Sequence, residues 1–258
     1  YTHEGAKVLE QIKKPKISPF IVPKVMPSSA VASISLILGI KGESYAISSA
    51  CASGSHSIMV ASRLIQSGEY DIVLTGGTEE VNWIQALGFD AMRALSRGYN
   101  DTTSKSSRPF DKGRDGFVLA CGAGVLILES EEHANKRKAR IISRVSGFNA
   151  NSNTTDMVFP DADSSAKVME NAIKNAELKP SDISYVNTHG TATPVGDPIE
   201  IRAIKQVFFD TNKEVAINST KSMTGHIIGA TGSVEAIFCT QMIDKKFICP
   251  TINLENPE

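Results

Sequence analysis

The chain has 258 residues, of which 41% are apolar, and its 27 basic and 28 acidic side chains leave a formal net charge of −1. This length and composition suit one large α/β domain or two small ones with a sizeable core. The balanced charge gives no indication of nucleic-acid binding or of an acidic tail. No apolar run reaches transmembrane length, and no signal peptide is visible.

Cysteine usage indicates the compartment. The four cysteines, Cys51, Cys121, Cys239 and Cys249, are scattered and show no C-x-x-C spacing. This argues against a zinc motif and a disulfide framework, and it favours a reducing cytoplasm. The sequence starts at Tyr1 and stops after Glu258 without a closing element. We therefore expect a fragment of a longer protein.

The N-terminal part predicts two helices separated by a basic loop. The first covers 1–14, and the second covers Ser29–Leu38, which is rich in Ala, Ser, Ile and Leu and is expected to be buried. Three lysines follow near the end of the first helix, Lys13, Lys14 and Lys16. They form either a solvated loop or part of a landing patch for an acidic carrier partner.

The stretch Ser48–His56 organises the chain. The apolar run Tyr45–Ile47 predicts a strand before it, and a helical pattern ending at Gly68 comes after it. Cys51 is therefore expected on a sharp strand-to-helix turn, where free N–H groups and the helix dipole stabilise a thiolate. The alternative is a small, inert core cysteine.

The next segments alternate between strands and helices. Tyr70–Thr75 predicts a strand that completes a βαβ unit, and hence a parallel sheet. The further expected elements, in order, are a helical stretch over Asn82–Leu95, a polar loop over 96–116, two strands within Phe117–Glu129, a helix over Glu131–Lys138, a strand over Arg140–Ala150 and an amphipathic helix over Ser164–Ala176. A loop as long as 96–116 inside a compact domain is often functional.

The C-terminal part carries an internal repeat. The expected elements are a strand at Ile183–Val186, a helix over 195–209, a strand at Val215–Ile217 and a helix over Ile227–Ile243. The segment Ala216–Ser219 with its continuation resembles Ala46–Ser49 with its continuation, and Lys221 aligns with Cys51. This predicts a duplicated fold whose halves face each other.

Three reactive side chains follow predicted parallel strands: Cys51, His189 and His226. Since ligand sites of open α/β sheets lie beyond the carboxyl ends of the strands, we expect the three to converge. The remaining histidines, His3, His56 and His133, are expected to be structural or solvated.

Together these residues make the chain resemble a family. The motifs are Ser48-Ser49-Ala50-Cys51-Ala52, Gly76-Gly77-Thr78-Glu79-Glu80, Phe89-Asp90-Ala91-Met92, Arg108-Pro109-Phe110-Asp111, Arg114-Asp115-Gly116-Phe117, His189-Gly190-Thr191-Ala192-Thr193-Pro194-Val195-Gly196-Asp197 and Thr220-Lys221-Ser222-Met223-Thr224-Gly225-His226. The chain resembles a β-ketoacyl-acyl-carrier-protein synthase, a condensing enzyme of fatty-acid elongation with a Cys-His-His site. The pairing of Lys221 with His226 separates it from relatives that use Cys-His-Asn.

The resemblance implies a thiolase-like α/β fold, with two similar βα halves stacked as α-β-α-β-α layers and a homodimer in the cytoplasm. One condensing-enzyme domain would cover 1–258, incomplete at both ends. Its parts would be 1–138, from the N-terminal half, and 139–258, most of the C-terminal half. The missing elements would be the first strands and helices and a Gly-rich C-terminal segment, so activity of the isolated chain is in doubt.

The implied reaction is a decarboxylating Claisen condensation between an acyl thioester on Cys51 and malonyl-acyl-carrier protein. Two neutral imidazoles, those of His189 and His226, would donate to the enolate oxygen while the helix activates the thiol. This chemistry needs no metal or redox cofactor. Further roles carried over are support of the site by Lys221, Glu235 and Glu200, bonds to the phosphopantetheine arm by Thr191 and Thr193, and a structural monovalent cation near Asn187 and Glu235.

Two alternatives stay open. A thiolase acting on coenzyme A thioesters needs a second reactive cysteine, and neither Cys239 nor Cys249 stands in a Gly-flanked turn. A non-catalytic partner subunit would normally lack the nucleophile that Cys51 provides.

Overall fold

The computed structural model describes residues 18–211 and 214–258, and its contacts divide the chain into two units, one through Ser48 and one from Ser49 to Glu258. The first unit contains α2 (Ile21–Val25) and α3 (Ser29–Leu38), which ends at Gly39 in the left-handed conformation, φ 66°. The helix predicted over 1–14 lies, with its three lysines, outside the described residues.

The expected helix at Ser29–Leu38 is confirmed, but its expected burial is wrong. Leu36, Ile37 and Leu38 are 84%, 80% and 62% exposed, and no residue of α3 is buried. The apolar composition of Ser29–Leu38 indicates a helix that can pack against another apolar surface. It does not supply the surface that the helix packs against.

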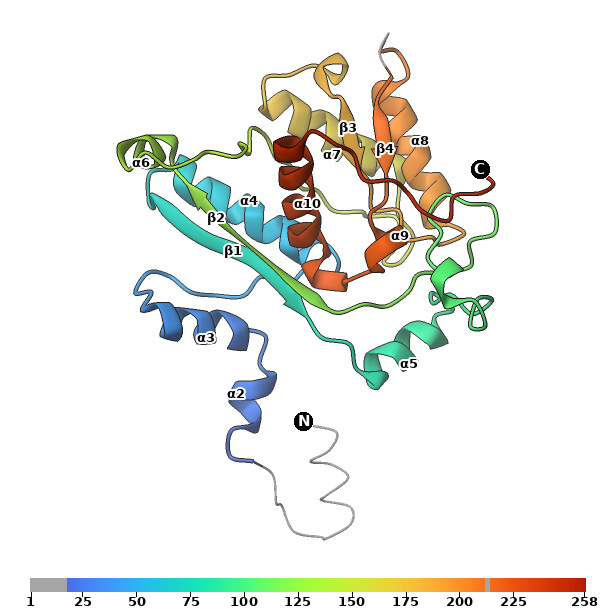
Figure 1. Ribbon diagram of the computed structural model, residues 1–258, viewed down its shortest axis with the longest axis horizontal. Helices are drawn as coiled ribbons and strands as arrows, with labels where there is room; N and C mark the ends of the chain where they lie inside the picture. Colours follow the sequence, from blue (N-terminus) through green and yellow to red (C-terminus); the bar gives the residue numbers. More distant parts are fainter. Residues whose placement is uncertain (1–17, 212–213) are drawn as a thin grey trace. The chain divides into compact units, whose positions relative to one another are not determined.

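The second unit is built around two strand pairs. Its elements in chain order are α4 (Ser53–Gln66), β1 (Ile72–Glu79), α5 (Trp83–Ala91), β2 (Gly122–Glu129), α6 (Glu131–Lys136), α7 (Ala162–Asn175), β3 (Tyr185–Asn187), α8 (Gly196–Phe208), β4 (Ala216–Asn218), α9 (Lys221–Thr224) and α10 (Thr231–Lys245), with short 3₁₀ turns at Thr103–Lys105, Pro180–Asp182 and Ile228–Ala230. β1 pairs antiparallel with β2, with Ile72 opposite Glu129, and β3 pairs parallel with β4, with Tyr185 opposite Ala216. Figure 1 shows both pairs.

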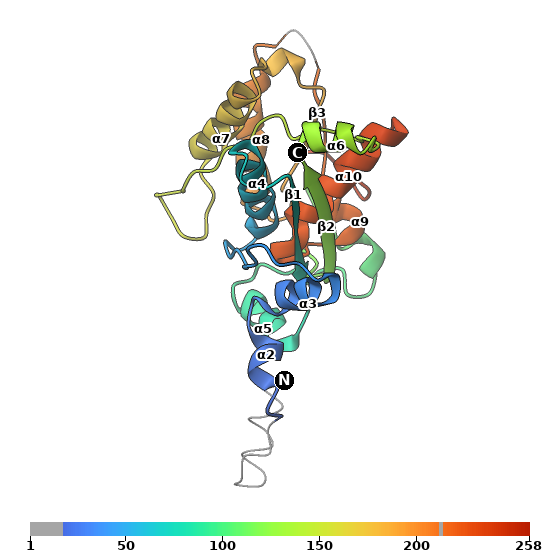
Figure 2. The same ribbon diagram turned by 90° about the vertical axis from the view of Figure 1, so that its left-hand side faces the viewer.

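Helices α4 and α10 pack on the β1–β2 pair and on each other. Seen from the side, α4 lies toward β1 and α10 toward β2 (Figure 2). Their backbones approach closely because glycines lie at the contact. A Cβ at Gly54 would come within 2.7 Å of the Ser233 nitrogen, and one at Gly232 within 2.8 Å of the Ser55 nitrogen. Two helices of the repeated segments therefore face each other, as the duplication predicts.

An apolar core lies between α7 and α8. Ala162 and Ala166 of α7 pack on Ala203, Ile204 and Phe208 of α8, all buried. Partly buried side chains around β3 and β4 pack against this core, among them Ile183, Val186 and Val215. The core supports the parallel β3–β4 pair and so positions the loops that follow these strands.

Three strand predictions are wrong. Tyr45–Ile47 and Arg140–Ala150 form no regular strand, and Phe117–Glu129 yields one strand, β2, instead of two. The expected parallel βαβ unit before β1 is therefore absent from the described chain. A regular strand needs a run of backbone hydrogen bonds to a neighbour. Among the described residues, Phe117 and Leu119 form only isolated bridges, to Leu95 and His226, and so extend no strand. The strands predicted at Ile183–Val186 and Val215–Ile217 are confirmed as β3 and β4, and they are parallel, as expected.

Candidate active site

The turn that carries Cys51 is held by local hydrogen bonds. Ala50 takes a left-handed backbone, φ 48°, and the Ser53 hydroxyl donates to the Ala50 carbonyl at 2.7 Å while accepting from the Ser49 N–H at 2.8 Å. Helix α4 begins at Ser53, with Ala52 as its N-cap. Cys51 therefore sits immediately before the first turn of α4, as predicted, and it is half-buried.

His226 is fixed by its backbone and by both ring nitrogens. Its N–H donates to the Val118 carbonyl at 2.8 Å, and its side chain is buried. Nδ1 lies 3.0 Å from the Thr231 hydroxyl, and Nε2 lies 3.0 Å from Cys51 Sγ. The preceding Gly225 has φ +70°, and a Cβ there would meet the Val118 oxygen at 2.8 Å. Glycine is therefore required for this approach.

His189 follows β3 closely and is anchored by a carboxylate. Glu200 of α8 accepts the N–H of His189 at 2.6 Å and that of Gly190 at 2.7 Å. Gly190 adopts φ +37°, and a Cβ there would lie 2.6 Å from the Ser219 Cβ. The Glu200 carboxylate thus fixes the loop from which the His189 ring projects.

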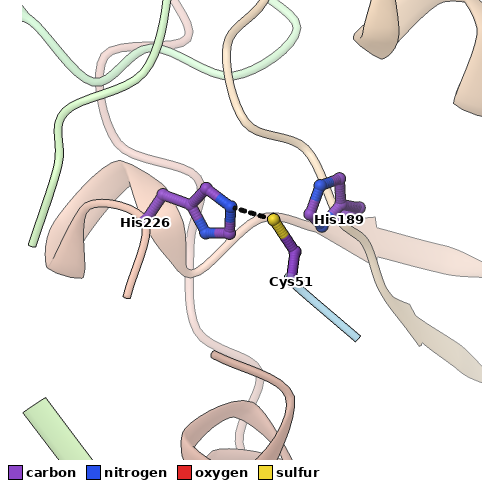
Figure 3. A group of neighbouring side chains, drawn as sticks. All are labelled: Cys51, His189 and His226. Atoms are coloured by element: carbon purple, nitrogen blue, oxygen red, sulfur yellow. Dashed lines mark hydrogen bonds between the residues drawn. The ribbon is translucent and has the colours of Figure 1, made fainter. Parts of the chain in front are cut away.

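The three predicted reactive groups converge. The ligating atoms of Cys51, His189 and His226 all lie within 4.8 Å of one another. The two imidazole rings meet edge to face, with centroids 5.2 Å apart and planes at 87°. Figure 3 shows the Cys51 sulfur between the two rings. Side chains 175 residues apart in the chain therefore share one site.

A buried ion pair lies behind the histidines. Lys221, 1% exposed, places its ammonium 2.7 Å from Glu235 Oε1, and the same oxygen accepts from the Thr220 hydroxyl at 3.1 Å. The ammonium also lies 3.5 Å from the carbonyl of Thr188, next to His189. Burial raises the pKa of Glu235, and Lys221 opposes this. The pair therefore puts a positive charge close to both imidazoles.

Burial and the Lys221 charge both favour uncharged imidazoles. Desolvation, followed by the Lys221 charge, lowers the pKa of His226 to about 3. The same two causes hold the pKa of His189 well below its usual range. Desolvation is the larger cause for both rings, and the Lys221 charge adds to it at each. Both rings are neutral near pH 7 and can accept or donate a proton.

The Cys51 thiol differs from the expectation. Burial raises its pKa, Lys221 and the backbone N–H of Cys51 lower it, and the Glu79 carboxylate raises it further. Burial therefore outweighs the start of α4, and the resting group is a thiol. The thiol therefore needs a base that removes its proton, and His226 Nε2 lies close enough to the sulfur to act as that base.

The other predicted site residues lie around this centre. Thr191 and Thr193 are on the His189 loop with hydroxyls 3.3 Å apart. Asn187 ends β3 and donates to the Tyr185 hydroxyl at 3.2 Å. The contacts of the two threonines with a pantetheine arm and the cation near Asn187 stay predictions.

The histidines outside the cluster have other partners. His56 bonds to Ser49 at 2.7 Å and His133 to Glu129 at 2.5 Å, which fits the structural roles expected for them. His3 lies outside the described residues.

Two contacts of the site escaped prediction from the sequence. Thr231 holds His226 Nδ1, and the Phe117 ring packs edge-on against His226, with centroids 5.2 Å apart. The position of Thr231 at the start of the last helix, five residues after His226, was the available signal. No sequence signal indicated the contact of Phe117, since it joins segments far apart in the sequence.

Comparison with known proteins agrees with this geometry. Residues 2–134 match the family model for the N-terminal domain of β-ketoacyl synthase, and 142–255 match the model for its C-terminal domain. The chain therefore belongs to the β-ketoacyl synthase family.

Curated relatives include two 3-oxoacyl-[acyl-carrier-protein] synthases. Synthase 1 of Haemophilus influenzae is 46% identical over 239 residues, covering 93% of this chain and 58% of the relative. Synthase 2 of Vibrio cholerae is 44% identical over 247 residues, covering 94% of this chain and 59% of the relative. The chain thus spans less than two thirds of the length of these relatives.

Solved structures establish the fold. A type II polyketide ketosynthase in complex with its acyl-carrier protein superposes with a TM-score of 0.93 at 33% identity, covering 100% of this chain and 65% of that one. A β-ketoacyl synthase from Burkholderia phymatum gives 0.92 at 35% identity, covering 99% and 62%. The fold is therefore the thiolase-like fold that was expected. Within the described residues, no helix is both long enough and apolar enough to cross a membrane.

Proposed function

We propose that this chain carries the active site of a condensing acyltransferase that elongates fatty acids by a decarboxylating Claisen condensation. The observation that carries the proposal is the contact of Cys51 Sγ with His226 Nε2 at 3.0 Å, with His189 in the same cluster. The relatives named 3-oxoacyl-[acyl-carrier-protein] synthase support a carrier-linked substrate.

In the first half-reaction, the acyl group moves to Cys51. His226 Nε2 accepts the thiol proton as Sγ attacks the thioester carbonyl carbon, while Nδ1–H donates to the Thr231 hydroxyl. The bond from the carbonyl carbon to the carrier sulfur breaks. The departing thiolate takes the proton from His226, which becomes neutral again.

In the second half-reaction, malonyl thioester loses CO₂. The electrons of the broken C–C bond form an enolate, whose oxygen accepts N–H bonds from His189 and His226. Before this step the His226 ring loses the proton on Nδ1 and gains one on Nε2 by exchange with solvent. Nε2–H then donates, while Nδ1 accepts from the Thr231 hydroxyl, which can donate as well as accept. The enolate carbon then attacks the Cys51 thioester, a C–C bond forms, and the bond from the carbonyl carbon to Cys51 sulfur breaks. The Cys51 thiolate that leaves takes a proton from solvent, which restores the resting thiol.

Supporting residues fix this centre. Burial, and next the charge of Lys221, keep both imidazoles neutral. Lys221 is itself held by Glu235, and Glu200 positions the His189 backbone. We assign Thr191 and Thr193 to the phosphopantetheine arm, since they share the loop of His189.

The wider assembly is part of the same proposal. We infer a carrier protein with acyl and malonyl groups on phosphopantetheine as the partner, a homodimer, a cytoplasmic location, and a division into halves at residue 138. The relative solved in complex with its acyl-carrier protein supports the first of these.

The test is condensation with acyl- and malonyl-acyl-carrier protein, with the β-ketoacyl product measured by mass spectrometry. Cys51→Ala, His189→Ala and His226→Ala should each lower the rate at least about 100-fold. Cys121→Ala is the matched control, since Cys121 is exposed and absent from the cluster. Full activity of Cys51→Ala would refute the proposal.

The same assay separates the alternatives. A thiolase would use acetyl-coenzyme A without malonyl-carrier. Its second nucleophile is not supported, because Cys239 lies inside α10 and burial raises the pKa of its thiol to about 11. A non-catalytic subunit would leave Cys51 unlabelled by an acyl donor.

A further inference from the structure

The cluster of Cys51, His189 and His226 has a second chemical capacity, which arises from its donor atoms alone. One sulfur and two imidazole nitrogens are the ligands that Zn²⁺ prefers. The three atoms lie within 4.8 Å of one another. Across residues 18–211 and 214–258, this is the one group of three or more His, Cys, Asp or Glu side chains so arranged.

We propose that these three residues bind Zn²⁺, with the cysteine as thiolate, and that the bound ion reversibly masks Cys51. Zinc binding at this cluster does not depend on the proposed condensation. On binding, the Cys51 S–H bond breaks, the sulfur forms a bond to zinc, and one proton goes to solvent. The two imidazoles give lone pairs and lose no proton, and a water molecule takes the fourth position.

The distances fit with small side-chain movements. A tetrahedral site with Zn–N bonds of about 2.0–2.1 Å and a Zn–S bond of about 2.3 Å keeps its donors about 3.3–3.6 Å apart. The Sγ–Nε2 distance of 3.0 Å therefore opens slightly, while the widest pair in the cluster closes. Side-chain rotation accounts for changes of this size, which are at most about 1.5 Å.

The surroundings of the cluster also suit a metal. Thr231 bonds to the second nitrogen of His226 at 3.0 Å, which is the contact that orients metal-ligating histidines. His189 is exposed, and it therefore provides an entry path from solvent. The nearby Lys221 ammonium is paired with Glu235 at 2.7 Å, so its repulsion of a cation is largely compensated.

The test uses Co²⁺ as a spectroscopic substitute for Zn²⁺ in the full chain. Titration should give a sulfur-to-cobalt charge-transfer band together with the intense visible bands of tetrahedral Co²⁺, and Zn²⁺ should displace both. Cys51→Ser should abolish the charge-transfer band. Cys121→Ser is the matched control and should leave the spectrum unchanged. An unchanged band in Cys51→Ser, or no band in the native chain, would overturn the proposal.

A second readout guards against variants that fail to fold. In the unmodified chain, saturating Zn²⁺ should slow alkylation of Cys51 by iodoacetamide about tenfold or more, and a chelator should restore the rate. Alkylation of Cys121 should change less than about twofold. Thr231→Val should weaken Co²⁺ binding about 10–100-fold. Equal alkylation of Cys51 with and without Zn²⁺ would contradict the proposal.

Neither readout uses an acyl or malonyl substrate. Absence of condensation therefore leaves the zinc proposal standing, and absence of metal binding leaves the condensation standing.

Discussion

The ion pair behind the two histidines gives the sharpest stability prediction. Lys221→Met leaves the Glu235 carboxylate, whose side chain is only 13% exposed, without its cation at 2.7 Å. Removing one partner of such a buried pair costs about 3–5 kcal/mol of the free energy of unfolding. We expect that loss in urea denaturation followed by circular dichroism, because the Thr220 hydroxyl alone is a weak substitute for an ammonium.

The double variant Lys221→Met/Glu235→Gln removes the unpaired charge. It should recover most of the lost stability, since a neutral replacement of a buried ion pair is often tolerated. Lys167→Met is the matched control: the Lys167–Glu170 pair on α7 is 63% and 46% exposed, and its loss should cost less than about 1 kcal/mol. If Lys221→Met costs no more than Lys167→Met, the assigned role of the pair is wrong.

Three further variants test the site and its supports. The pKa of His226 is about 3 in the fold and 6.5 in the unfolded chain, so the unfolded state binds more protons between these values. The free energy of unfolding should therefore fall by up to about 1.4 kcal/mol per pH unit below pH 6.5, and His226→Gln should flatten that slope. Equal slopes for the two proteins would count against the buried, neutral state of His226. Gly54→Ala should lower the free energy of unfolding by about 1–3 kcal/mol, because the new Cβ meets backbone at 2.7 Å. In the control Gly88→Ala the new Cβ has nothing within 4 Å, and this variant should stabilise α5 by about 0.5–1 kcal/mol. Thermal unfolding compares the two variants, and equal effects would refute the close packing of α4 on α10. Glu200→Ala should slow decarboxylation of malonyl thioester while leaving acylation of Cys51 intact, since the Glu200 carboxylate holds only the backbone of His189, at 2.6 Å, and of Gly190, at 2.7 Å. Single-turnover measurements of each step test this prediction. An equal loss of rate in both steps would contradict it.

The sequence was sufficient to predict which side chains converge at the site. Cys51, His189 and His226 each follow a predicted strand or turn, and the structure brings them together. Lys221 and Glu235 were paired by resemblance, and they form an ion pair. Local patterns also predicted helices α4, α7, α8 and α10 to within a few residues.

Properties that depend on distant neighbours could not be predicted in this way. The apolar residues of Arg140–Ala150 indicated a strand, but pairing needs a partner that a local pattern cannot reveal. The pKa of Cys51 is a similar case. The start of α4 suggested a thiolate, whereas burial by residues far along the chain raises the pKa of the thiol. Likewise, Phe117 contacts His226 only because the fold brings two distant segments of the chain together.

The assignment of Cys51 as the nucleophile is tested most directly by locating the site of acylation. The protein is incubated with an acyl-carrier thioester, digested and mapped by mass spectrometry. We expect a thioester on Cys51, none on Cys121, Cys239 or Cys249, and no adduct in Cys51→Ala. An acyl group on another cysteine, or no adduct on Cys51 in the folded protein, would show that the assignment is wrong.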